Sequence, residues 1–431
     1  MSAAWKTALA LLGSVAATPL LAQDAGRDWA ITNARVVIGD GSAPIERGTV
    51  VVRGGKVIAA GADVAVPAGV RTIDARGGWV TPGLFVAVTN LGLVDVEQVT
   101  ESSDESADTA QFNAALDVAP AINPLSQQIA VSRAGGITRA AIAPSSSTAI
   151  FAGQGAVIDL ATDGTPITSA RAFQYVELGE AGAALAGGSR VSAHAALRNA
   201  LGEAQGFATR SHDAMLTRAD AAALIPVVTG KQQLLVHVER AQDIRMVLAL
   251  RTEFPSLKLV IVGASEGWLV AREIAAAGVP VIASPLNDLP AQFETLAATQ
   301  SNVGRMTAAG VKVAIGKLSN NDQPRWAPQY AGNLVALNKV PGAKGLSWGQ
   351  AFATISSIPA EILGLGDRFG SLKPGRAGDL VIWDGDPLEV TSGVIAVYID
   401  GVEQPLSNHQ TRLRERYRTP AEGSLPKAYD W

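Results

Sequence analysis

A Gly-Ala-Ser-Glu-Gly run at residues 263–267 has the spacing of a nucleophile elbow, which holds a serine on a sharp turn between a strand and a helix. An apolar stretch precedes this run and a helical pattern follows it, as an elbow requires. With Ser265 as the nucleophile, a triad in the usual order would add Asp288 or Asp322 and then His409. The alternative interpretation is a tight strand-to-helix turn without a catalytic serine.

Other types of chemistry are restricted by composition. Cysteine is absent, which excludes disulfides, thiolate metal sites and a cysteine nucleophile. Residues 95–108 are rich in Asp and Glu and could gather a cation, although such a run is more often a solvated loop. The glycine-rich residues 179–188 lack a strong preceding strand and a following Gly-Lys-Ser, so they predict a flexible loop rather than a phosphate cradle.

The whole chain has the composition of a folded protein. Of its 431 residues, 48% are hydrophobic and 17% are charged, so it can bury a sizeable core in one large domain or in one large and one small domain. The formal net charge is −4 and no dense run of Lys and Arg occurs. Nucleic acid is therefore not expected as a partner.

The first residues have the pattern of a secretory signal peptide. Lys6 precedes an apolar run at residues 7–15, and Pro19-Leu20-Leu21-Ala22 offers a small-residue cleavage site after Ala22. This predicts a periplasmic or secreted protein, with an uncleaved anchor as the alternative. No later segment sustains about 18 apolar residues, so we expect no membrane span in the mature chain.

The elements that must position any site fall into three blocks. Residues 29–83 are strand-like, with a hairpin expected at Gly54-Gly55, and strands recur at 379–383 and 395–399. Between these flanks, strands at 233–238, 257–262, 279–283 and 311–315 alternate with helices at 241–254, 266–277 and 296–309. Repeated βα units predict an α/β fold with a parallel sheet, and roughly 290 residues suit an eight-stranded barrel. A doubly wound open sheet is the competing architecture.

Two segments resemble the amidohydrolase superfamily. The run Ile-Asp-Ala-Arg-Gly-Gly-Trp-Val-Thr-Pro-Gly-Leu at 73–84 is similar to that family's passage from a small β-sandwich into the first barrel strand. The run Gly-Ser-Leu-Lys-Pro-Gly-Arg-Ala-Gly-Asp-Leu-Val-Ile-Trp at 370–383 is similar to the return. The chain looks like a divergent member of the imidazolonepropionase-like and dipeptidase-like group.

The resemblance implies a TIM-like (β/α)8 barrel beside a small composite β-sandwich that both chain ends build. The implied segments are a signal peptide at 1–22, sandwich strands at 23–83, the barrel at 84–369, further sandwich strands at 370–410 and a tail at 411–431.

The resemblance also implies a divalent metal such as zinc, but the usual ligands are degraded here. Val88 and Asn90 stand at the positions of the family's His-x-His pair, and neither is a good zinc ligand. His237 matches a family histidine at a strand end, and Glu239 shares its face, so both are candidate ligands. The alternative for His237 is a hydrogen-bonded histidine without metal.

At the last barrel strand the family keeps a catalytic aspartate. Here only Asp322 could serve, several residues late, and it could equally be a turn or capping residue. Lys317 places a positive charge where the family has a carboxylate, so Lys317 and Asn90 are expected to line the ligand pocket.

The implied function is hydrolysis of a carbon–nitrogen bond in a small-molecule substrate, such as a cyclic amide or a small dipeptide. The alternative is a catalytically silent relative that binds a ligand or pairs with an active homologue; a homo-oligomer is a further expectation. Fold alone does not decide between these functions.

Overall fold

The structure is a computed structural model that describes residues 27–164, 166–211, 213–284, 287–318 and 324–419. The expected signal peptide and Asp322 lie outside these residues. Among the residues that are described, no helix has the length and apolar character needed to cross a membrane.

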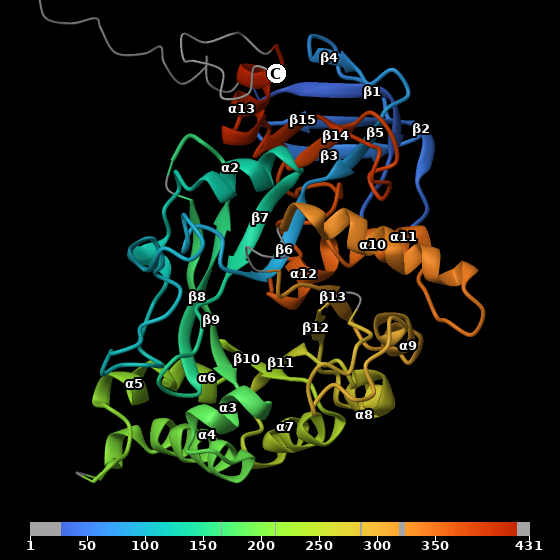
Figure 1. The fold of residues 1–431 in the computed structure, drawn as a ribbon. Helices are drawn as coiled ribbons and strands as arrows, with labels where there is room; N and C mark the ends of the chain where they lie inside the picture. Colours follow the sequence, from blue (N-terminus) through green and yellow to red (C-terminus); the bar gives the residue numbers. More distant parts are fainter. Residues whose placement is uncertain (1–26, 165, 212, 285–286, 319–323, 420–431) are drawn as a thin grey trace, which may run out of the picture.

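One sheet takes its strands from both ends of the chain (Figure 1). Its order is β16-β15-β14-β5-β1-β2-β3, with β4 beside β1. The strands are β1 (Trp29–Val36), β2 (Ile45–Arg53), β3 (Lys56–Gly61), β4 (Arg71–Asp74), β5 (Trp79–Pro82), β14 (Leu380–Trp383), β15 (Val394–Ile399) and β16 (Val402–Gln404). The predicted hairpin is present between β2 and β3, where Gly54 and Gly55 have φ values of 56° and 74°.

The second sheet is barrel-like and nearly closed, with the order β13-β12-β11-β10-β9-β8-β7-β6. Its strands are β6 (Leu84–Thr89), β7 (Ile137–Ile142), β8 (Phe151–Asp159), β9 (Ile167–Glu177), β10 (Gln233–Val238), β11 (Lys258–Gly263), β12 (Val281–Ala283) and β13 (Val313–Ile315). A bridge between Ala87 and Gly316 joins the first and last strands. Gly316 is required there, because a Cβ atom would lie 2.2 Å from the Ala87 carbonyl oxygen.

The expectation of an all-parallel barrel is wrong for β8, which runs antiparallel to both β7 and β9. The connections at 143–150 and 160–166 explain this reversal, because a crossover between parallel strands needs a dozen or more residues. The other strand pairs of this sheet are parallel. Their carboxyl ends therefore share one rim.

Helices surround the second sheet (Figure 1). They are α2 (Gln127–Ala134), α3 (Gly179–Leu185), α4 (Arg190–Gln205), α5 (Arg218–Ala223), α6 (Ile225–Val228), α7 (Ala241–Glu253), α8 (Ala271–Ala277), α9 (Asn302–Ala308), α10 (Ala327–Ala336), α11 (Trp348–Ala353) and α12 (Ser357–Ile362), while α13 (His409–Tyr417) lies near the first sheet. Gly278 ends α8 in the left-handed region, with φ 62°, as a C-terminal glycine commonly does.

The prediction of a flexible loop at 179–188 is wrong, because α3 occupies most of it and β9 directly precedes it. Alanine and leucine favour the helix once Gly179 has made the turn, with φ 69°. This helix forms part of the cavity wall described below.

The two sheets are linked by a buried ion pair. Arg139, in β7, donates from Nε to Asp379 Oδ2 at 2.7 Å and from Nη2 to Asp379 Oδ1 at 3.1 Å. Asp379 directly precedes β14, and the two side chains are only 3% and 4% exposed. The Arg139 guanidinium also lies over the Phe369 ring, 4.2 Å from its centroid. A bidentate pair of this kind fixes the orientation of one sheet against the other.

Candidate functional site

Charged side chains converge at the carboxyl ends of the barrel-like sheet. Tyr175 and Glu177 end β9, His237 and Glu239 lie at the end of β10, and Lys317 follows β13. His237 and Glu177 are direct partners in the pairing of β10 with β9, which brings their side chains together. In parallel α/β sheets this edge is where ligands bind.

His237 lies between two carboxylates. Its Nδ1 hydrogen-bonds to Glu177 Oε1, and its Nε2 lies 2.8 Å from Glu239 Oε1. Burial lowers the pKa of His237, but the charge and hydrogen bond of Glu177 and the hydrogen bond of Glu239 outweigh burial and raise this pKa to about 9. This shift favours the protonated ring, with one carboxylate beside each nitrogen, although the nearby charge of Lys317 opposes it.

Both carboxylate oxygens of Glu239 have hydrogen-bond partners. Oε2 accepts from the Ser265 backbone N–H at 2.8 Å and from Ser265 Oγ at 2.7 Å, while Oε1 faces His237. Burial raises the pKa of Glu239, but its hydrogen bond to His237 and the charges of His237 and Lys317 lower this pKa to about 2. Gly263 makes room for this carboxylate, because a Cβ atom there would lie 2.5 Å from Glu239 Oε1.

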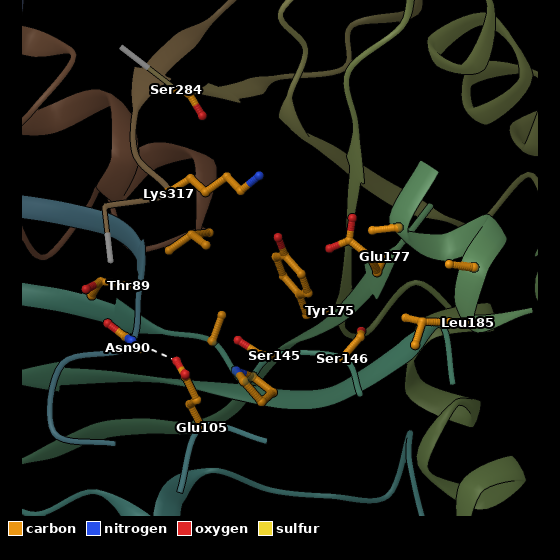
Figure 2. A pocket seen from close by; sticks show the side chains of 15 residues that line it. Thr89, Asn90, Glu105, Ser145, Ser146, Tyr175, Glu177, Leu185, Ser284 and Lys317 are labelled. Atoms are coloured by element: carbon orange, nitrogen blue, oxygen red, sulfur yellow. Dashed lines mark hydrogen bonds between the residues drawn. The ribbon is translucent and has the colours of Figure 1, made fainter. Parts of the chain in front are cut away.

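A cavity of about 620 Å³ is lined by Glu177 and Lys317 of this cluster (Figure 2). Its walls come from the ends of β6, β7 and β9, from α3 and from the segments after β12 and β13; they include Val88, Thr89, Asn90, Glu105, Ser145, Ser146, Tyr175, Glu177, Leu185, Ser284 and Lys317. Figure 2 shows Tyr175 and Glu177, both from β9, and Lys317, from another wall, pointing into the same space. The volume suits a small molecule.

The two expected pocket residues both line this cavity. Asn90 donates from Nδ2 to Glu105 Oε2 at 2.8 Å, which attaches the acidic segment 95–108 to the rim. Lys317 comes from the opposite wall, and its Nζ lies 2.5 Å from His237 Nε2 and 3.7 Å from Glu239 Oε1. The ammonium group thus lies next to the expected ligands His237 and Glu239.

Ser265 has partners that differ from those of a triad serine. Its side chain is buried, Oγ donates to Glu239, and Asn287 Nδ2 donates to Oγ at 3.0 Å. His409 begins α13, which packs against α2. Asp288 accepts a hydrogen bond from Gln300, and Asp322 lies outside the described residues. The described part of the chain thus gives Ser265 a carboxylate neighbour in place of a histidine.

The residues present do not fit a resident divalent metal. No group of three His, Asp or Glu side chains in the described ranges could hold one metal ion, and the whole sequence has no cysteine. Both ring nitrogens of His237 already face carboxylates, and an imidazolium cannot ligate a metal. Val88 and Asn90 add no imidazole to the rim. No chemical step below therefore uses a bound metal.

Glu177 and Tyr175 are site residues that sequence reasoning missed. Burial, with the charges of Glu177 and Glu239, raises the pKa of Tyr175 well above its usual value, so its hydroxyl stays a donor. The alternation of Tyr175 and Glu177 at a strand end was the available signal. It was hidden because the strand at 167–177 carries polar residues along its first half.

Comparisons with known proteins agree on one family. A sequence profile described as the amidohydrolase family matches residues 269–403. An imidazolonepropionase from Mesorhizobium japonicum is 24% identical over 374 residues, which are 79% of this chain and 87% of that protein. An amidohydrolase from Hapsidospora irregularis is 38% identical over 85 residues, but these are 18% of this chain and only 9% of that protein.

Solved structures agree with the sequence matches. The crystal structure of an amidohydrolase from Thermotoga maritima MSB8 superposes with a TM-score of 0.77 at 25% identity, and the match covers 87% of this chain and 98% of that one. The similarity therefore extends over most of the chain.

Proposed function

Because this chain belongs to the amidohydrolase superfamily, we propose that it hydrolyses a carbon–nitrogen bond of a small cyclic amide or dipeptide-like molecule in the cavity at the barrel mouth. The observation that carries the proposal is the convergence of Tyr175, Glu177 and Lys317 on one cavity of about 620 Å³. The cyclic-amide class follows from the similarity to an imidazolonepropionase.

The side chains suggest a route for the reaction. Tyr175 and Lys317 are N–H or O–H donors that can stabilise the oxygen of an attacked carbonyl group. Glu177 is a carboxylate at the cavity wall, and its bond to His237 fixes its position. In the proposed step Glu177 takes a proton from water, the water oxygen bonds to the carbonyl carbon, and the proton passes to the nitrogen as the carbon–nitrogen bond breaks.

Turnover of a compound panel tests this function. The purified chain is incubated with five-membered cyclic amides and with dipeptides, and newly formed carboxylates and amines are measured by mass spectrometry. We expect hydrolysis of at least one class, and a loss of roughly 100-fold or more in kcat/KM for E177Q, as for removal of a general base. E253Q is the matched control, because Glu253 pairs with Arg198 in an exposed ion pair and should have no effect.

A second candidate is a relative that binds the ligand without turnover, alone or beside an active homologue. The carboxylates that hold both nitrogens of His237 favour it, because they leave no open metal position. Under this candidate a compound of the panel would raise the melting temperature of the chain without any product, because binding adds about 2.7 kcal/mol to the free energy of unfolding at a ligand concentration of 100 Kd. Absence of both product and thermal shift with every compound would contradict both candidates.

The remaining expectations are part of the proposal. We propose export to the periplasm or beyond the cell, division of the chain near residues 83 and 369 into sandwich and barrel parts, and assembly as a homo-oligomer or with an active homologue. Light scattering of the purified chain, alone and after co-expression with such a homologue, measures the assembly.

A further inference from the structure

We propose that the ammonium group of Lys317 is the resident cation of this site and takes the place of a divalent metal that the surrounding side chains cannot hold. The inference rests on the geometry of the charged cluster and holds whether or not the chain turns over a substrate.

The backbone fixes Lys317 on the seam that closes the barrel-like sheet. Its N–H donates to the Ala87 carbonyl at 2.9 Å, and the next N–H, of Leu318, donates to the Val88 carbonyl at 3.0 Å. Lys317 and Val88 both have positive φ values, 58° and 59°. Such conformations cost energy in residues other than glycine, and they cluster at functional sites. The seam therefore holds Lys317 so that its side chain runs inward across the cavity (Figure 2).

The end of this side chain reaches the charged cluster. Nζ lies 2.5 Å from His237 Nε2 and 3.7 Å from Glu239 Oε1. This is the side of the imidazole ring on which a metal bound to Nε2 would lie. The His237 and Glu239 side chains are 9% and 8% exposed, whereas the Lys317 side chain is 37% exposed. Lys317 and Glu177 thus line the cavity, whereas His237 and Glu239 are not among its lining residues.

Charge balance supports the assignment. Two carboxylates, Glu177 and Glu239, contact His237, and buried carboxylates require compensating positive charge. The Lys317 ammonium group supplies positive charge to this cluster, with Nζ 3.7 Å from Glu239 Oε1. Lys317 therefore provides positive charge at the mouth of the cluster without a metal ion.

Zinc titration of the full mature chain tests the proposal. Chelator-treated wild type, H237A, K317D, K317D/H237A and K258D are titrated with zinc chloride in a calorimeter. K258D is the matched control, because Lys258 is exposed at the opposite end of β11. K317D replaces the cation with a carboxylate, which with His237 and Glu239 makes the three protein donors of an open zinc site. We expect one zinc ion per chain in K317D and none in wild type, K258D or K317D/H237A.

Two results would overturn the proposal. One is the binding of one zinc ion per chain by the wild type but not by H237A. A zinc ion on His237 would mean that the Lys317 ammonium group does not replace the metal. The other is a folded K317D that binds no more zinc than K258D. Should K317D fail to fold, thermal denaturation of K317M against K258M decides: the proposal expects a lower melting temperature for K317M, and equal values would contradict it. None of these measurements needs a substrate, so their failure is separate from failure of the hydrolase proposal.

Discussion

At the scale of single residues, a pattern of neighbouring charges defines the site more than any one side chain does. His237, Glu239, Asn90 and Lys317 were expected from the resemblance to the family's motif positions; Asn90 and Lys317 line the cavity, and Lys317 contacts His237, which contacts Glu239. Glu177 was missed, although it is the direct partner of His237 across two strands. A sequence gives the end of each strand but not the register between strands that lie 60 residues apart.

Stability should depend on pH through His237 and Glu239. The folded-state pKa of His237 is raised from 6.5 to about 9, so its contribution is complete below pH 6.5 and is lost as pH rises through 9. The pKa of Glu239 is lowered from 4.5 to about 2, so its contribution is complete above pH 4.5 and is lost as pH falls through 2. Between pH 4.5 and 6.5 both residues contribute their full stabilisation to the folded state.

Melting temperatures of wild type and H237Q between pH 5 and 9.5 measure this dependence. The stability advantage of the wild type over H237Q should shrink as pH rises from 7 to 9.5. An advantage that stays constant over this range would mean that His237 gains no proton affinity from its carboxylate neighbours.

At the scale of elements, the regular βα units could be predicted from the sequence, but the antiparallel direction of β8 could not. The bounds of β10 and α7 follow the predicted ranges 233–238 and 241–254 closely, because Ile244, Val247 and Leu250 give α7 a buried apolar face at helical spacing. The predicted helix at 296–309 is shortened to α9, and 179–188 is a helix rather than a loop. The direction of β8 depends on connection length and on pairing with strands already in place, which local patterns do not contain.

Gly263 gives a test of how an element positions the site. It has φ 87°, and an added Cβ atom would lie 2.5 Å from Glu239 Oε1. We expect G263A to lose more than the ~1–2 kcal/mol of backbone strain alone, because Glu239 must also move. G278A is the control: Gly278 has φ 62° at the end of α8, with no atom within 4 Å of an added Cβ.

Free energies of unfolding from urea titrations compare the two variants. A loss in G263A no larger than the loss in G278A would mean that the Glu239 carboxylate is not confined by this turn.

At the scale of the whole molecule, the joining of both chain ends in one sheet could be predicted from two short segments near residues 73–84 and 370–383. The buried pair that ties this sheet to the barrel-like one could not, because Arg139 and Asp379 are 240 residues apart in sequence. The residues next to Arg139 in the sequence do not indicate that it pairs with Asp379, and the neighbours of Asp379 do not indicate Arg139.

Asp379 and Asp400 both contact Arg139, but we expect loss of their charges to lower the free energy of unfolding by different amounts. D379N should cost about 3–5 kcal/mol of unfolding free energy, since it leaves the buried Arg139 charge without its main partner. D400N should cost about 1 kcal/mol or less, because Asp400 is 51% exposed although it lies 2.8 Å from Arg139 Nη2. Equal losses in urea titrations of the two variants would show that burial does not set the strength of this contact.

A crystal structure grown with excess zinc, with data collected on both sides of the zinc absorption edge, locates any metal in the barrel mouth. We expect no anomalous peak within bonding distance of His237 Nε2, and density for the Lys317 ammonium in that place. An anomalous peak bound to His237, with Lys317 turned away from it, would contradict the assignment of the lysine as the cation of this site.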